Sequence, residues 1–176
     1  YFRMERYLLR HETFAGGMSA PITREVLERG HAAGVLPYDP KRDEVVLIEQ
    51  FRVGALAAGR DPWLIEVVAG IVDSGEAHDA VARREAQEEA GVAIKRLALI
   101  SDLMLSAGAV SETFRLYCGE VDAGAALVSQ HLAPGLKRLV EARNLCPILP
   151  DAQTFLAANV DRFERADPLE REVAGE

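Results

Sequence analysis

The spacing of hydrophobic and polar positions changes several times along the chain, and each change predicts a different element. Residues 2–10 and about 16–28 read as short strands, joined by a turn at a pair of glycines. Residues 45–48, VVLI, form a continuous and mostly β-branched run. Such a run is typical of a strand that is buried on both faces.

The pattern predicts further strands over residues 63–68, 94–105 and 113–121. Small residues fill positions 54–62, which predicts a loop, and the polar segment 78–90 is predicted to be a helix.

A second helix is predicted over residues 151–166, where an aspartate stands at the N-cap position. Its apolar residues, Phe155, Leu156, Val160 and Phe163, follow helical spacing. Strands with helices on either side predict the α/β class, as an α/β/α sandwich over a mixed β-sheet. We expect a strand region over residues 1–30 and the main domain over 31–176.

Length and composition limit the possible functions. A chain of 176 residues, 49% hydrophobic and 27% charged, is long enough to bury the core of one globular domain. Its net charge of −8, with no basic stripe to offset it, argues against a nucleic-acid partner. No apolar run approaches the length of a membrane span. The start, YFRMERYLLR, has no signal-peptide pattern, so we expect a cytoplasmic protein in which Cys118 and Cys146 are reduced, buried thiols.

Residues 70–92, GIVDSGEAHDAVARREAQEEAGV, form an acidic stretch. Its carboxylates are those of Asp73, Glu76, Asp79, Glu85, Glu88 and Glu89. Glu85 lies three positions before Glu88 and four before Glu89, which puts the three carboxylates on one face of a helix. Like charges so placed repel, so the arrangement costs stability unless a cation lies among them. Mg²⁺ prefers carboxylate oxygens and keeps waters that a phosphate substrate can replace.

Arg84 comes directly before Glu85 and has two candidate partners. It can pair with Glu88 one helical turn later, or with Glu76 from the preceding loop. Either ion pair would orient the carboxylates around a metal.

This stretch resembles the Nudix box, G-x(5)-E-x(7)-R-E-U-x-E-E-x-G-U, at every defined position. The matching residues are Gly70, Glu76, Arg84, Glu85, Ala86, Glu88, Glu89, Gly91 and Val92. The alternative is a solvated acidic helix with a glycine C-cap at Gly91. A match at all the defined positions favours the first interpretation. The resemblance implies a Nudix-type α/β/α sandwich and metal-assisted attack of water on a nucleoside diphosphate linked to another group.

The flanking segments resemble those of bacterial ADP-ribose pyrophosphatases. They are EVLERGHAAGVLPYDPKRDEVVLIEQFR, WLIEVVAG before the box and SETFRLY after it. The resemblance covers about two thirds of the chain, from about residue 10 to residue 122. It implies hydrolysis of ADP-ribose, a homodimer formed through the N-terminal strands, and Mg²⁺ or Mn²⁺ as cofactor.

The resemblance also implies a set of metal-site residues. The ligands would be Glu85, Glu89 and the carbonyl of Ala69, with Glu88 acting through water. Arg84 and Glu76 would complete the catalytic set.

For the substrate, the resemblance implies that Arg52 holds the diphosphate, that Arg24 reaches the ligand from the partner subunit, and that Glu112 contacts it. Gly70 and Ile71 would line the ribose-facing side. Each of the first three has a simpler alternative: a surface arginine at a strand end, an edge-strand charge, and a partly exposed carboxylate at the start of a strand. We interpret His31 as a packed or hydrogen-bonded structural residue and Trp63 as a core residue.

Two segments depart from the family pattern. The family loop SPGGTSE is SAGAVSE here, with Ala107 in place of proline and Val110 in place of threonine. Farther on, the family has an acidic loop that provides a general base. In this chain, residues 125–150 have one acidic residue, Glu141, among the basic residues Lys137, Arg138 and Arg143. The resemblance ends near residue 129, and Glu141 is a weak candidate for the base.

The sequence therefore predicts a Mg²⁺-dependent hydrolase that splits ADP-ribose into AMP and ribose 5-phosphate. One alternative keeps the chemistry but changes the substrate to another nucleoside diphosphate sugar or a dinucleotide. A second alternative is a protein that binds ADP-ribose and turns it over poorly. The intact box favours an enzyme, and the altered segment after residue 129 favours the binding protein.

Overall fold

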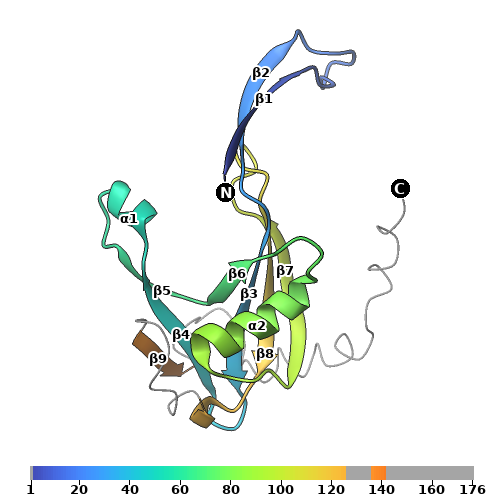
Figure 1. The fold of residues 1–176 in the computed structure, drawn as a ribbon. Coiled ribbons are helices and arrows are strands. Elements are labelled where there is room, and N and C mark those ends of the chain that lie inside the picture. Colours follow the sequence, from blue (N-terminus) through green and yellow to red (C-terminus); the bar gives the residue numbers. More distant parts are fainter. Residues whose placement is uncertain (1, 126–135, 142–176) are drawn as a thin grey trace.

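A computed structural model describes residues 2–125 and 136–141. Strands β1 (Arg3–Leu9) and β2 (Ile22–Glu28) form an antiparallel hairpin that stands away from the body of the molecule (Figure 1). The second strand begins six residues later than the sequence pattern predicts, because residues 16–21 lie outside the β1–β2 ladder, in the connection between the two strands.

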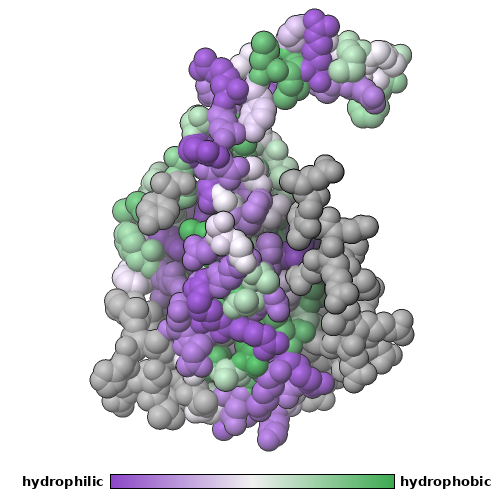
Figure 2. Space-filling view, turned by 45° about the vertical axis from the view of Figure 1, so that its right-hand side comes forward, coloured by the Kyte–Doolittle hydropathy of each residue, from purple (hydrophilic) through white to green (hydrophobic). Residues whose placement is uncertain are grey.

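The hairpin exposes many apolar side chains. They are Met4, Tyr7, Leu8 and Leu9 of β1, together with Phe2, Phe14 and Met18 beside the strands. On the face shown in Figure 2, hydrophobic residues are visible on the hairpin, while hydrophilic residues cover much of the body below it.

The body is built on a mixed sheet of seven strands. These are β3 (Ala32–Asp39), β4 (Glu44–Phe51), β5 (Trp63–Glu66), β6 (Val68–Ile71), β7 (Arg96–Met104), β8 (Thr113–Glu120) and β9 (Leu136–Glu141). The order is β5-β4-β3-β8-β7, with β6 paired to β3 and β9 paired to β4. Strands β3 and β8 run parallel and the other pairs are antiparallel, which confirms the predicted mixed sheet.

Helix α2 (His78–Ala90) lies across one face of this sheet (Figure 1). Its buried residues are Val81, Ala82, Ala86 and Ala90, and these small side chains let the helix approach the strands closely. The helix ends at Gly91, whose left-handed conformation (φ 65°) closes the last turn. The predicted α/β class is confirmed, and the helix predicted over 151–166 lies outside the described residues.

Strand β4 is buried on both faces, as its sequence predicts. Val46 and Ile48 pack into the cluster beneath α2, while Val45 and Leu47 pack on the opposite face. Cys118 joins the second cluster, and burial raises the pKa of its thiol to about 11, so it is an inert core residue. Cys146 lies outside the described residues.

Two local predictions are wrong. Residues 54–62 are not all loop, because a short helix, α1 (Val53–Ala57), begins the segment. Alanine and leucine favour helix, and here they outweigh the glycine at 54. Trp63 is not a core residue: it is 52% exposed and packs edge-on against Phe51 across the β4–β5 pair.

A short 3-10 helix, η1 (Ala123–Ala125), follows β8. Among the residues that the structure describes, no helix is both long and apolar enough to cross a membrane. The division into a strand region over 1–30 and a domain over 31–176 stays a prediction.

Candidate active site

The acidic face of α2 lies against β6. Strand β6 is held by β3 through the register pairs Ala33–Gly70 and Gly34–Ala69. A Cβ atom placed on Gly70 would lie 1.8 Å from Oε1 of Glu85. The Glu85 carboxylate therefore occupies the space that any side chain at position 70 would fill.

Arg84 joins the glutamates of the box. Its Nε and Nη2 donate to the two carboxylate oxygens of Glu76, at 3.0 and 3.1 Å. Its Nη1 donates to Glu85 at 2.7 Å and to Glu88 at 3.1 Å. The sequence left Glu76 and Glu88 open as alternative partners, and the structure has both.

This network shifts the pKa values of its members. The hydrogen bonds from Arg84 lower the pKa of the Glu76 carboxyl, and the same ion pair raises the pKa of the Arg84 guanidinium. Both groups are therefore charged at neutral pH, and Arg84 offsets part of the repulsion among the box carboxylates.

Glu89 is held by the sheet and not by Arg84. Nε2 of Gln50, from β4, donates to Glu89 Oε1 at 2.9 Å, and the backbone N–H of Ala69 approaches Oε2 at 3.4 Å. Burial raises the pKa of the Glu89 carboxyl and the charge of Glu85 raises it further, against the hydrogen bonds from Gln50 and Ala69. A nearby cation would remove this electrostatic cost.

The donor set fits a hard divalent cation that is only partly coordinated by protein. In the part of the chain that the structure describes, no three His, Cys, Asp or Glu side chains converge on one point that would hold an ion. Glu85 and Glu88 bond to Arg84, and Glu89 bonds to Gln50. Mg²⁺ commonly takes one or two carboxylates and completes its shell with waters and substrate phosphates. Glu85, Glu89 and the Ala69 carbonyl offer that kind of set.

Arg52 lies at the end of β4, where its backbone leads into α1. It forms a two-pronged ion pair with Glu66 of β5, with Nε–Oε2 and Nη2–Oε2 distances of 2.9 and 2.6 Å. The pair with Glu66 raises the pKa of Arg52, and the charge of Glu89 contributes in the same direction. Arg52 is thus close enough to the box to interact electrostatically with Glu89.

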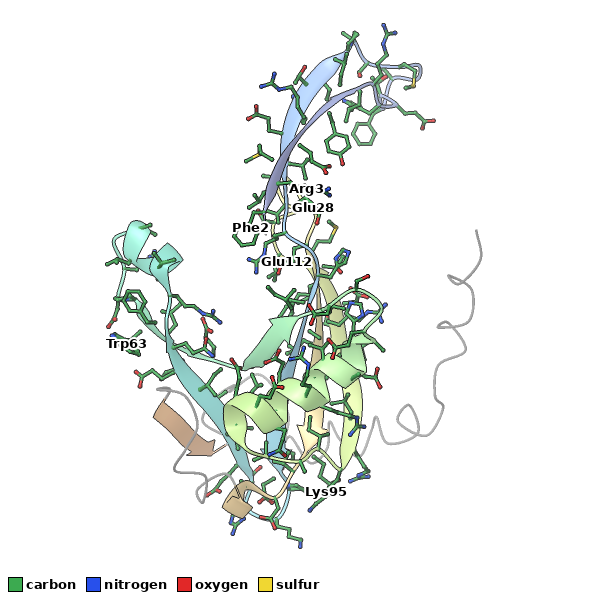
Figure 3. All side chains as sticks on the ribbon, viewed as in Figure 1. Phe2, Arg3, Glu28, Trp63, Lys95 and Glu112 are labelled. Atoms are coloured by element: carbon green, nitrogen blue, oxygen red, sulfur yellow. The ribbon has the colours of Figure 1, made fainter. Side chains whose placement is uncertain are left out.

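Two of the other predicted substrate residues, Arg24 and Glu112, are bonded to residues outside the box. Arg24 is exposed on the hairpin, and its side chain donates to the carbonyl of Thr23 at 2.8 Å. Glu112 lies near the base of the hairpin (Figure 3). It is only 6% exposed and pairs with Arg29 at 3.4 Å, so the alternative of a partly exposed carboxylate is wrong. Ile71 is 46% exposed at the end of β6.

The loop that lacks the family proline is fixed by contacts with the end of β2. The Leu27 N–H donates to the Ala109 carbonyl at 2.8 Å, and Val110 forms a parallel bridge with Leu27. The Ser111 hydroxyl donates to Glu28 at 2.7 Å. These hydrogen bonds restrain the loop where proline would otherwise do so. His31 is hydrogen-bonded to Thr113, as expected for a structural histidine.

Glu141 lies at the wrong end of the sheet for a base beside the box. In the β4–β9 ladder it is opposite Glu44, at the start of β4, whereas Gln50 lies near the other end. Six residues of strand separate these positions by roughly 20 Å. Lys137 and Arg138 pair with Ile48 and Leu47 in the same ladder, and Arg143 lies outside the described residues.

Two residues of this site, Gln50 and Glu66, were not found from the sequence. Alternation along β4 places Gln50 and Arg52 on the same side of the strand, and this signal could have indicated Gln50. Glu66 becomes recognisable only once β5 is paired with β4, because its partner Arg52 is fourteen residues away.

Known proteins share much of the sequence of this chain. The family model described as NUDIX domain matches residues 28–128. ADP-ribose pyrophosphatase of Escherichia coli K12 is 50% identical over 123 residues, which cover 70% of this chain and 59% of that protein. ADP-ribose pyrophosphatase of Haemophilus influenzae is 43% identical over 129 residues, or 72% of this chain and 59% of that protein.

More distant relatives have other names. GDP-mannose pyrophosphatase of Klebsiella pneumoniae is 36% identical over 119 residues, 65% of this chain and 60% of that protein. The chain spans about three fifths of the length of the curated relatives it matches. A solved structure titled as an ADP compounds hydrolase has a TM-score of 0.61 at 20% identity, covering 92% of this chain and 82% of that one. That likeness supports the fold.

Proposed function

The chain belongs to the Nudix family, and from this membership we propose that it hydrolyses the diphosphate of ADP-ribose to AMP and ribose 5-phosphate with Mg²⁺. The observation that carries the proposal is the pair Glu85 and Glu89 on one face of α2, above a glycine that leaves room for the Glu85 carboxylate. The choice of ADP-ribose rests on the 50% identity with the E. coli protein of that name.

The residues of the site have separate tasks in this proposal. When bound, the divalent cation would polarise the phosphoryl group and lower the pKa of the attacking water. Glu85, Glu89 and the Ala69 carbonyl would hold it, with Glu88 acting through water. Arg84, itself fixed by Glu76, orients Glu85 by a 2.7 Å hydrogen bond.

The segment in which the family resemblance implies a general base is poor in acidic residues in this chain. Residues 125–150 contain a single acidic residue, Glu141, and its register position is opposite the start of β4. General-base assistance contributes ~10²–10⁴-fold in rate. We therefore propose an enzyme with measurable but slow turnover.

A direct assay tests the proposed reaction. Purified protein would be incubated with ADP-ribose or GDP-mannose, with Mg²⁺ or with EDTA, and the products separated by chromatography. AMP and ribose 5-phosphate formed only with the metal would support the proposal. Faster cleavage of GDP-mannose would favour the nucleotide-sugar alternative. GDP-mannose is included because one group of relatives is named GDP-mannose pyrophosphatase. Tight ADP-ribose binding without products would favour the binding protein.

We also propose that the hairpin pairs with a second copy of the chain, and that Arg24 then reaches the partner's ligand. The apolar side chains exposed along the hairpin support this proposal, because such residues are usually covered in an assembly. Sedimentation of the purified protein would report the oligomeric state. The cytoplasmic location stays a prediction.

Replacing Arg52 with alanine is expected to weaken ADP-ribose binding about 10–100-fold, because hydrogen bonds to charged groups contribute ~1.5–3 kcal/mol. The free energy of unfolding should change by less than about 1 kcal/mol, since the Arg52–Glu66 pair is partly exposed. Isothermal titration with ADP-ribose and thermal unfolding would measure the two effects.

Arg60→Ala is the matched control, because Arg60 is an exposed arginine in the segment that follows α1. It should bind ADP-ribose like the unmodified protein. Normal affinity in the Arg52 variant would identify Arg52 as surface charge.

A further inference from the structure

Glu89 is fixed by groups that are distant in sequence. Gln50 lies 39 positions earlier, on β4, and its side-chain amide reaches Glu89 Oε1 at 2.9 Å. The Ala69 N–H lies 3.4 Å from the other oxygen. Both Gln50 and Glu89 are half-buried, so water competes less for this contact than it would at the surface.

The donor at this position is neutral, unlike the donor to Glu85. Arg84 neutralises part of the charge on Glu85, whereas an amide orients Glu89 and leaves its full negative charge for a cation. Without an amide donor, the Glu89 side chain would be repelled by Glu85 and attracted by Arg52, both of which interact with it electrostatically. Repulsion would turn the Glu89 carboxylate away from Glu85, and attraction would turn it towards Arg52 and its partner Glu66.

We propose that Gln50 is a positioning residue of the metal site, which holds the Glu89 carboxylate in the orientation that binds the cation. The proposal rests on the proposed function only in treating Glu89 as a metal ligand. Partners of metal ligands typically contribute 10–100-fold to metal affinity, because they fix the geometry of the ligand atoms.

The test is Mn²⁺ binding to the Gln50→Met variant, measured by electron paramagnetic resonance without substrate. Methionine has a similar length and no amide donor, so we expect the dissociation constant for Mn²⁺ to rise 10–100-fold. The thermal unfolding midpoint in EDTA should fall only modestly, because the variant loses one hydrogen bond to a half-buried carboxylate. Gln87→Met is the matched control, since Gln87 is exposed on α2, and it should bind Mn²⁺ normally.

A double-mutant cycle separates positioning from a general effect on the fold. If Gln50 acts through Glu89, then Gln50→Met should weaken Mn²⁺ binding little further in the Glu89→Gln background. Full additivity of the two changes, or normal Mn²⁺ binding by Gln50→Met, would overturn the proposal. If Glu89→Gln itself binds Mn²⁺ normally, the metal site of the proposed function fails instead.

A measurement on the unmodified protein covers the case in which Gln50→Met does not fold. In NMR spectra, the side-chain amide resonances of Gln50 should shift as Mg²⁺ is added. The midpoint of this shift should coincide with the midpoint of metal binding. Resonances that stay in place through saturation would also overturn the proposal.

Discussion

Replacement of Glu85 or Glu89 by glutamine is expected to lower Mg²⁺-dependent hydrolysis by at least ~10³-fold. Each change exchanges an anionic oxygen ligand for a neutral amide while keeping the size of the side chain. Stabilisation of transition-state charge by a metal contributes several kcal/mol, and each ~1.4 kcal/mol corresponds to a factor of ten in rate. Steady-state kinetics with ADP-ribose over a range of Mg²⁺ concentrations would measure the loss.

The Glu89→Gln variant is expected to lose activity but not stability. Burial and the neighbouring Glu85 charge raise the pKa of the Glu89 carboxyl, so its ionised form destabilises the metal-free protein above its unfolded pKa. Glutamine removes this cost, and the Glu89 variant should unfold in EDTA at a temperature no lower than the unmodified protein. The stabilising effect of glutamine should disappear at low pH, where Glu89 is protonated in both states.

Glu141→Gln is the matched control for these variants. It makes the same chemical change on β9, at a register position opposite the start of β4. Its turnover should equal that of the unmodified protein. If Glu141→Gln alone abolishes hydrolysis while ADP-ribose still binds, then Glu141 is the base and our interpretation of this segment is wrong. Normal activity in both box variants would refute the metal site.

The box could be predicted from the sequence because its geometry is local. Glu85, Glu88 and Glu89 lie within two turns of one helix, so their spacing alone fixes their shared face. The bonds of Arg84 to Glu76 and Glu88 likewise span only eight and four positions.

The contacts that join the box to the sheet could not be predicted in this way. The Gln50–Glu89 bond spans 39 residues and depends on how α2 lies across β4 and β6. Trp63 shows the same limit: its hydrophobicity suggested the core, but β5 leaves it half-exposed beside Phe51. By contrast, the run at 45–48 was interpreted correctly because burial on both faces leaves no polar positions in the strand.

Changing Gly70 to alanine is expected to reduce hydrolysis by at least ~10²-fold, although the substitution adds only one methyl group. The new Cβ would lie 1.8 Å from Oε1 and 2.2 Å from Cδ of Glu85, so the carboxylate has to move. A displacement of about 1 Å in a reacting group can cost ~10²-fold in rate. Kinetics with ADP-ribose and Mn²⁺ affinity should both show the loss.

The fold should tolerate this change, because the obstructed group is the end of a flexible side chain. Gly70 does not have a positive φ, so alanine is compatible with its backbone conformation. We expect the free energy of unfolding to change by about 1 kcal/mol or less, apart from any contribution of bound metal. Gly54→Ala is the control, since nothing lies within 4 Å of the added Cβ, and it should retain full activity.

The effect of Gly70→Ala should depend on Glu85. If the added methyl acts only by displacing that carboxylate, it should cost little further activity in a Glu85→Gln background, whose metal ligand is already lost. A further large loss in the double variant would mean that Gly70 also has to admit the substrate to β6. Unchanged activity in Gly70→Ala would mean that Glu85 can bind the cation from another rotamer, and the close approach of α2 to β6 would then be a packing feature alone.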